Sequence, residues 1–196
     1  MRRLFWLLPV SFALTACPFE SNVPLETGPV QPIDSSLIGY WYGIVKDGSD
    51  YFGVEALEIA RDSDSIYSII RYGKKIKGDI ILPDTSHFTG YVSYLDDEAY
   101  MNIAGSIVTV TTKGKKNEPV VKTHRIYHIA GISLKNDTLV VKTVSEDFSP
   151  VKKLFKNPEE LKLALRAAKQ GNKPIFDELF SLSYRKIPKP QPPKGF

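Results

Sequence analysis

The chain is poor in the residue types and motifs that usually indicate chemistry. Its 196 residues contain one cysteine, Cys17, and three histidines. A single cysteine excludes an intrachain disulfide framework and a cysteine-rich zinc site. No apolar run reaches the ~20 residues that an ordinary membrane-spanning helix needs, and no P-loop, dinucleotide-binding, nucleophile-elbow or HExxH pattern occurs. The composition, 42% hydrophobic and 24% charged, is that of a globular protein. We therefore expect a folded, non-enzymatic protein without cofactor or metal.

The first residues have the organisation of a bacterial export signal. A basic start, Met1-Arg2-Arg3, precedes a mostly apolar stretch over 4–16 that has the length of a signal-peptide core. The stretch ends in Leu14-Thr15-Ala16-Cys17, which resembles the lipobox of bacterial lipoproteins. The resemblance implies that the Cys17 thiol receives a diacylglycerol, that the bond between Ala16 and Cys17 is cut, and that the new amine is acylated, commonly with palmitate. An ordinary secretory signal with an incidental cysteine, or a buried core cysteine, remains the alternative.

Cleavage at this position would change the charge and set the location. It would remove Arg2 and Arg3 and no acid, so the formal net charge of +4 would fall by two. Such a weak excess gives little support for nucleic-acid binding, and we expect no nucleic-acid partner. Cys17 is followed by Pro18 and not by the Asp that tends to retain lipoproteins in the inner membrane. The expected location is the periplasmic face of the outer membrane of a Gram-negative cell, held there by the lipid anchor.

Proline-rich flanks enclose a single predicted domain, as expected at about 150 residues per domain. We predict a semi-rigid tether over 17–33, a folded domain over 34–187 and a proline-rich tail over 188–196. Within the tail, Pro190 and Pro193 form a PxxP spacing. The tail is interpreted as a solvated segment or, alternatively, as a docking peptide for an envelope partner.

Most of the predicted domain consists of short segments rich in Val, Ile, Tyr, Phe and Thr, which favour strands. Residues that tolerate tight turns, among them Asp96-Asp97 and Lys135-Asn136-Asp137, separate these segments. The pattern predicts an antiparallel meander. The first strand is apolar on both faces, so we expect the C-terminal helix to cover its outer face. The predicted strands are 37–46, 52–60, 65–72, 75–82, 88–95, 100–103, 106–112, 120–129 and 138–144, with a helical turn at 175–180 and a final strand at 182–187.

One α-helix is predicted near the C-terminus. Asn157 is a suitable N-cap, Pro158 suits the first helical position, and Glu160 stands where a capping box requires it. Gly171 is the expected C-terminal stop. One face carries an apolar stripe that predicts packing onto the sheet: Leu161, Ala164, Leu165 and Ala168.

Two segments of the predicted domain resemble a known fold. Gly39-Tyr40-Trp41 has the Gly-x-Trp pattern found at the start of lipocalin-like barrels, and 129–144 resembles their last hairpin. The fold implied is mainly β: an antiparallel, lipocalin-like β-barrel with a C-terminal α-helix packed on it and a final short strand. In lipocalins a basic residue near the C-terminal end of the barrel packs over this tryptophan and closes that end. The resemblance therefore implies a cation–π contact on Trp41 from Arg185, or from Lys186.

The chain as a whole also resembles an uncharacterised group of bacterial lipoproteins. The shared features begin with Cys17-Pro18-Phe19, Pro24-Leu25 and a first strand that contains Leu37-Ile38-Gly39-Tyr40-Trp41. They end with a Ser-Glu-Asp-Phe segment at 145–148, a Glu-Glu-Leu helix start at 159–161 and a closing strand with Arg185. The resemblance implies the anchor and the barrel, and it implies no activity.

The histidines and acids do not form a recognisable reactive site. His124 and His128 have the i, i+4 spacing that binds a metal on a helix, but their segment is predicted as a strand, where they stand about 13 Å apart. We expect two partly exposed histidines, with Tyr127 and Ile129 facing the core. Paired acids at predicted turns are interpreted as solvated loop residues and not as the acid–base pair of a hydrolase: Asp47/Asp50, Asp62/Asp64, Asp96/Asp97/Glu98 and Glu146/Asp147.

Aromatic residues are plentiful and leave two interpretations open. Ten tyrosines and ten phenylalanines occur, and most tyrosines lie in or beside predicted strands. They are interpreted as core packing or, alternatively, as an aromatic-lined cup for an apolar or glycan ligand, with Trp41 and Tyr127 as candidate ligand-binding residues. The first functional hypothesis is a lipid-anchored barrel that binds a small apolar ligand or lipid. The second is an accessory or scaffolding lipoprotein that docks an envelope protein complex.

Overall fold

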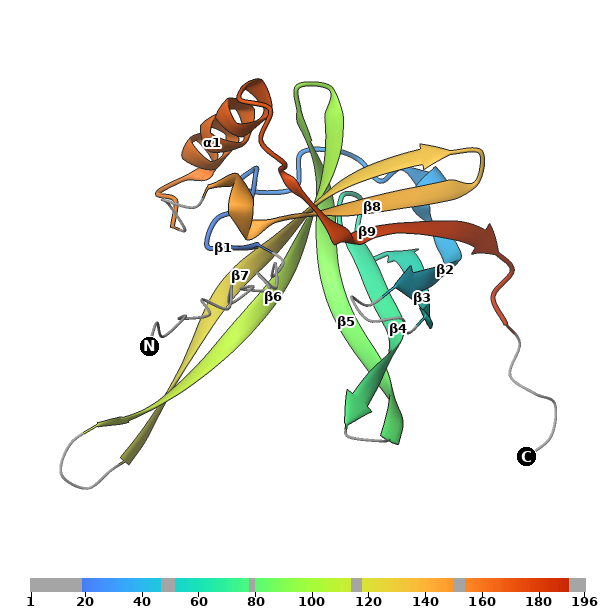
Figure 1. Ribbon diagram of the computed structural model, residues 1–196, viewed down its shortest axis with the longest axis horizontal. Helices are drawn as coiled ribbons and strands as arrows, with labels where there is room; N and C mark the ends of the chain where they lie inside the picture. Colours follow the sequence, from blue (N-terminus) through green and yellow to red (C-terminus); the bar gives the residue numbers. More distant parts are fainter. Residues whose placement is uncertain (1–18, 47–51, 78–79, 114–117, 150–153, 191–196) are drawn as a thin grey trace, which may run out of the picture.

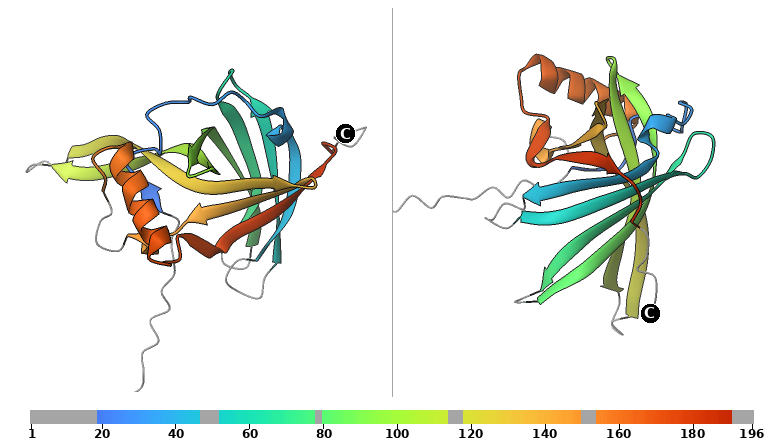
Figure 2. Two further views of the ribbon diagram at one scale, coloured as in Figure 1. Left: turned by 90° about the horizontal axis from the view of Figure 1, so that it is seen from above. Right: turned by 90° about the vertical axis from the view of Figure 1, so that its right-hand side faces the viewer.

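The predicted barrel is confirmed by a computed structural model, which describes residues 19–46, 52–77, 80–113, 118–149 and 154–190. Eight antiparallel strands close into a barrel, and one C-terminal helix and one further short strand lie against its outside (Figures 1 and 2). The predicted cleavage and lipidation residues, Ala16 and Cys17, lie outside the described residues.

The barrel strands follow one another as neighbours along the chain. From β2 to β8 each strand pairs antiparallel with the next. The last strand, β9, returns after the helix and pairs with both β8 and β2, which closes the barrel. The strands are β2 (Gly39–Lys46), β3 (Phe52–Arg61), β4 (Tyr67–Lys77), β5 (Ile80–Leu95), β6 (Glu98–Lys113), β7 (Glu118–Lys135), β8 (Thr138–Val144) and β9 (Phe176–Ile187). The remaining elements are β1 (Glu20–Ser21), two short 3-10 helices, η1 (Ser35–Leu37) and η2 (Glu146–Phe148), and α1 (Pro158–Gln170).

Several strands are longer than the sequence predicts. Gly73 and Pro83, which fall in the gaps between the predicted strands 65–72, 75–82 and 88–95, instead lie inside the β4–β5 hairpin, opposite Asp84 and Lys74. The two segments predicted at 100–103 and 106–112 form one strand, because Gly105 pairs with Ile126 of β7. The predicted helical turn at 175–180 is the start of β9. In the first two cases the continuous pairing of a neighbouring strand outweighs the local turn preference of a glycine or proline.

Two tight hairpins are confirmed at their predicted positions. Asp96 and Asp97 join β5 to β6 with φ angles of 51° and 65°, and Asn136 and Asp137 join β7 to β8 with φ angles of 49° and 57°. Two consecutive left-handed residues are typical of a type I′ turn, whose twist matches that of the strands. Asn and Asp tolerate this region of φ better than other non-glycine residues.

One apolar core fills part of the barrel interior. Along each strand alternate residues point inward, so the inward set of β2 is Gly39, Trp41 and Gly43. The outward set of β2 is not covered as expected, since Tyr42 and Ile44 are 40% and 64% exposed. The interior core consists of Leu37, Trp41, Ile59, Tyr67, Ile69, Val92, Met101, Leu139 and Tyr184.

A second core lies between α1 and the outer face of the barrel on β5 to β8, so the helix covers these strands and not β2 (Figure 2). The helix begins as predicted, with Asn157 Oδ1 accepting a hydrogen bond from the Glu160 amide at 2.9 Å, and it ends before Gly171. The predicted stripe faces this core. The buried members of the second core are Phe19, Leu25, Leu95, Tyr100, Ile129, Val144, Phe148, Phe155, Leu161, Leu165, Ala168 and Ile175.

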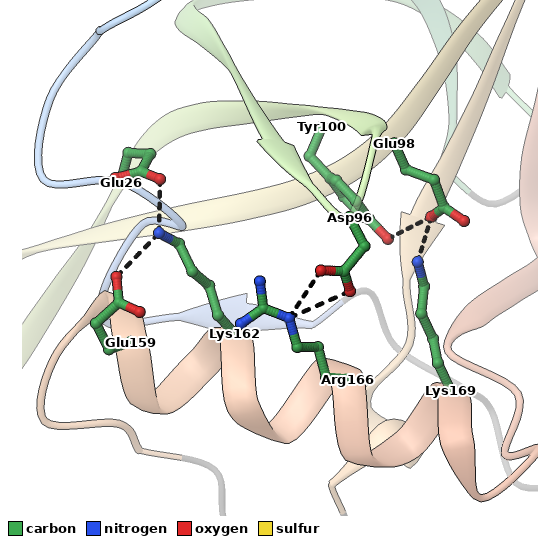
Figure 3. A network of polar contacts seen from close by, with 8 residues as sticks. All are labelled: Glu26, Asp96, Glu98, Tyr100, Glu159, Lys162, Arg166 and Lys169. Atoms are coloured by element: carbon green, nitrogen blue, oxygen red, sulfur yellow. Dashed lines mark hydrogen bonds and ion pairs between the residues drawn. The ribbon is translucent and has the colours of Figure 1, made fainter.

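Ion pairs along one side of α1 fix the helix to the β5–β6 turn and the N-terminal segment (Figure 3). Arg166 Nε lies 2.9 Å from Asp96 Oδ1, and Lys169 contacts Glu98. Lys162 Nζ lies 2.6 Å from Glu26 Oε1. The pairs of Arg166 and Lys169 lie at the surface and contribute little each to stability. Lys162 is 8% exposed, so its pair with Glu26 is more enclosed. No helix of the described residues is long and apolar enough to cross a membrane.

The segment predicted as a tether is part of the folded unit from Phe19 onward. The Phe19 ring meets the Phe148 ring edge-on at 4.9 Å, and the side chain is 4% exposed. Leu25 is fully buried, and its amide donates to Asn102 Oδ1 at 2.7 Å. The Ile33 amide donates a hydrogen bond to the Asp64 carbonyl oxygen at 2.9 Å. The few apolar residues between the prolines are the contacts that hold this segment on the barrel.

Candidate ligand-binding site

One end of the barrel is closed by Trp41. Its side chain is fully buried, and its Nε1 donates to the Leu37 carbonyl at 2.9 Å. Lys186 Nζ lies 5.1 Å from the centre of the Trp41 ring, within the range of a cation–π contact, and donates to the Ser36 carbonyl at 2.9 Å. The end of the barrel is therefore sealed by an aromatic ring, a short helix and an ammonium group.

The basic residue on Trp41 is Lys186 and not Arg185. Lys186 shares the inward face of β9 with Tyr184 and lies opposite Trp41, whereas Arg185 is exposed on the other face. The Gly-x-Trp pattern has a geometric reason here. Gly39 has a φ of +147°, and a Cβ at this position would stand 2.6 Å from Lys186 Cε. The absence of a Cβ at Gly39 therefore leaves the space through which the Lys186 side chain reaches the Trp41 ring.

Above this closed end the barrel contains a cavity of about 380 Å³. Leu37 contributes to its lining, so the cavity begins where the Trp41 plug ends. Its wall is mostly aliphatic, with contributions from seven of the eight barrel strands. The apolar lining residues are Leu37, Leu57, Ile59, Ile69, Phe88, Met101, Ile103, Ala130, Ile132, Leu139, Val141 and Leu182, and the polar ones are Glu55, Arg71, His128, Thr143 and Tyr184.

A charged cluster stands in this apolar wall. Glu55 is 4% exposed, and its Oε2 accepts hydrogen bonds from Arg71 Nε and lies 2.6 Å from Arg71 Nη2. Its Oε1 accepts a hydrogen bond from the Tyr184 hydroxyl. A buried carboxylate requires such partners, because an unpaired charge in an apolar interior is very costly. Gly43 makes room for the cluster, since a Cβ there would stand 2.8 Å from the Tyr184 ring.

The protonation states of the cluster follow from its surroundings. Burial, followed by the negative charge of Glu55, raises the pKa of the Tyr184 hydroxyl far above its usual range, so Tyr184 remains a donor. Burial alone would lower the pKa of Arg71, but the hydrogen bond and charge of Glu55, with smaller effects from Tyr184 and Asp84, outweigh it and raise the pKa. Arg71 is thus a permanent cation. Asp84 Oδ2 lies 3.5 Å from its Nη1, so two carboxylates share one guanidinium.

The candidate binding residues predicted from the sequence do not line the cavity. Trp41 belongs to the plug beneath it. Tyr127 lies on the opposite face of β7 and packs, like Ile129, against the second core outside the barrel. On the same strand His128 points to the cavity and His124 is exposed, so the two histidines lie on a strand as predicted, but only one reaches the interior.

Most of the acids predicted at turns are exposed where the structure describes them, as at Asp62, Asp64, Asp96 and Asp97, whereas Glu146 is half-buried. Asp47 and Asp50 lie outside the described residues. Within the described ranges no group of three or more His, Cys, Asp or Glu side chains is placed to hold a metal ion. The arrangement brings together a non-polar cavity and one polar cluster.

The charged pair was missed by the sequence analysis, although a signal existed. On β3, Glu55 points to the same face as the apolar residues Leu57 and Ile59. On β4, Arg71 points to the same face as Tyr67 and Ile69. A charged residue on the same face of a strand as apolar residues indicates either that this face is exposed or that the charge is paired inside the protein. The closed barrel shows that the charge is paired inside.

Comparison of the chain with protein-family models, curated proteins and solved structures found no match.

Proposed function

We propose that this protein is a lipid-anchored, non-enzymatic component of the bacterial envelope whose barrel binds a small apolar ligand. The observation that carries the proposal is the cavity of about 380 Å³ inside the barrel. Ligand sites in proteins typically measure about 300–1,000 Å³ and combine an apolar lining with a few polar groups. The cavity has this size and this composition, and a well-packed interior leaves few voids larger than a water molecule.

The anchor part of the proposal rests on the lipobox-like sequence before Cys17. Phe19 is already packed in the second core, and a chain spans at most about 3.3–3.6 Å per residue. Acylated Cys17, two positions earlier, would therefore hold the barrel within roughly 7 Å of the lipid surface. The ligand would then enter or leave a barrel that lies directly at the membrane, where apolar molecules are concentrated.

A cavity-filling substitution tests ligand binding. Val141→Phe places a phenyl ring in the cavity wall on β8, whereas Val140→Phe places the same ring on the outer face of that strand. We expect the first variant to weaken the binding of an uncharged medium-chain alcohol at least tenfold in calorimetric titration, and the second to leave it unchanged. Equal affinity for both variants would refute binding inside the barrel.

The anchor has its own test. Cys17→Ser removes the thiol that would carry the diacylglycerol, so the protein should move from the membrane fraction to the soluble fraction after cell lysis. Incorporation of labelled palmitate should be lost as well. A variant that remains in the membrane fraction and still incorporates the label would contradict the anchor.

A second candidate function is an accessory role in which the protein docks an envelope complex. It is favoured by an exposed apolar area on the outer faces of β2 and β3, where Tyr42, Ile44 and Val54 are 40%, 64% and 39% exposed. Ile44 and Val54 lie directly opposite each other in the β2–β3 pair. If this surface docks a partner, Ile44→Lys should abolish a crosslinked product that forms in intact cells, and Leu163→Lys on the exposed face of α1 should preserve it.

A further inference from the structure

We propose that the cavity selects apolar ligands whose polar end is uncharged and rejects fatty carboxylates, and that Glu55 is the specificity-determining residue. The inference rests on the proposed binding of an apolar ligand and adds the chemical class of its polar end. Three side chains carry it: Glu55 on β3, Arg71 on β4 and Tyr184 on β9.

The charges of the wall disfavour an anion. Arg71 is the one lysine or arginine among the described residues that line the cavity. Its Nε and Nη2 are directed to Glu55, and its Nη1 lies 3.5 Å from Asp84. A ligand carboxylate would have to share this guanidinium with Glu55, at a distance where two carboxylates repel each other. A ligand carboxylate that displaced Glu55 from Arg71 would leave the buried Glu55 carboxylate without its partner, which is also costly.

The same cluster accepts an uncharged polar end. A guanidinium carries five N–H donors, and the contacts with Glu55 and Asp84 leave part of this capacity unused. The Arg71 side chain is also 37% exposed, so its remaining donors are not sealed in the wall. The oxygen of an alcohol, ester or amide accepts such a hydrogen bond without bringing a second negative charge. Glu55 therefore changes Arg71 from an anion site into a donor for neutral ligands.

The size of the cavity limits the apolar part of the ligand. Taking about 30 Å³ for each water-sized group, 380 Å³ accommodates roughly a dozen non-hydrogen atoms. A ten-carbon chain with one polar end has this size. Decan-1-ol and decanoate are matched probes, because they share the chain and differ in the charge of the polar end.

The experiment compares these two probes by calorimetric titration at pH 8 on the full chain carrying Cys17→Ser, which cannot carry the diacylglycerol on residue 17. We expect decan-1-ol to bind at least tenfold more tightly than decanoate. Glu55→Gln keeps the shape of the side chain and an acceptor for Arg71 but removes the charge, so decanoate affinity should rise at least tenfold. Glu58→Gln is the matched control, because Glu58 lies on the same strand but binds Lys189 and Tyr72 on the outside.

Each result has a distinct meaning. Binding of decan-1-ol with equal or tighter binding of decanoate would overturn the selectivity and leave the proposed ligand-binding function intact. An unchanged preference in a folded Glu55→Gln variant would overturn the role of Glu55. If neither probe binds, the proposed function fails, and this inference fails with it. The ratio measured on the chain with native Glu55 tests the selectivity even if Glu55→Gln does not fold.

Discussion

Asn102 provides the sharpest test of how the N-terminal segment is attached to the barrel. The residue lies on the outer face of β6 and is fully buried. Its Oδ1 accepts from the Leu25 amide at 2.7 Å, and its Nδ2 donates to Ser93 Oγ at 2.7 Å and to the Tyr91 carbonyl at 3.3 Å. Asn102→Ala removes all three hydrogen bonds and leaves the Leu25 amide buried without its acceptor.

The expected cost follows from these three contacts. A buried donor without an acceptor costs about 1–3 kcal/mol, and each of the two other lost hydrogen bonds costs about 0.5–1.5 kcal/mol. The free energy of unfolding should therefore fall by roughly 2–6 kcal/mol, a large part of the 5–15 kcal/mol typical of a domain. For a chain of this size, each kcal/mol corresponds to a loss of about 2–4 °C in Tm.

Urea unfolding measures the effect, with the fluorescence of Trp41, the one tryptophan among the described residues, as the signal. Asn22→Ala is the matched control. Asn22 also bridges two backbone groups, the amide and carbonyl of Phe155, but it is exposed, so water replaces the lost contacts. Its cost should stay below about 1 kcal/mol. Equal costs for the two variants would refute the idea that the buried amide attaches the segment.

Two further predictions concern the cavity and the helix. Gly43→Ala should lower the free energy of unfolding by about 1–3 kcal/mol, because its Cβ would stand 2.8 Å from the Tyr184 ring and 2.9 Å from the Ser183 carbonyl oxygen, whereas Gly28→Ala meets nothing within 4 Å and should be neutral in the same urea titration. Burial raises the pKa of Glu98, but its hydrogen bonds with Lys169 and Tyr100 outweigh this effect and hold the pKa below its ordinary value of 4.5. The stabilisation by Glu98 is therefore complete above pH 4.5 and is lost as the pH falls through the folded-state pKa, so Glu98→Gln should reduce the loss of stability between pH 5 and pH 3; an identical acid profile would contradict this.

Local chemistry was sufficient where a few neighbouring residues decide the structure. Asn157, Pro158 and Glu160 predicted the start of α1, because capping depends on backbone groups within one turn. Asp96-Asp97 and Asn136-Asp137 predicted their hairpins, because a type I′ turn requires residues that tolerate positive φ. In contrast, the interruptions expected at Gly73 and Pro83 did not occur, because pairing with a distant strand decided the conformation.

The order of residues alone was enough to predict a β-rich chain with one capped helix, its hairpin turns and a glycine and tryptophan placed to close a barrel. Each of these depends on side-chain alternation or on contacts between near neighbours. The folded chain was needed to show that Phe19 and Leu25 join a second core and that Lys186 and not Arg185 covers Trp41. It was also needed to show that Glu55 contacts Arg71 and Tyr184 in the wall of an apolar cavity. Most of these contacts join segments far apart in the sequence, such as Trp41 with Lys186 and Glu55 with Tyr184, and the pairing of β2 with β9 that closes the barrel brings these two together.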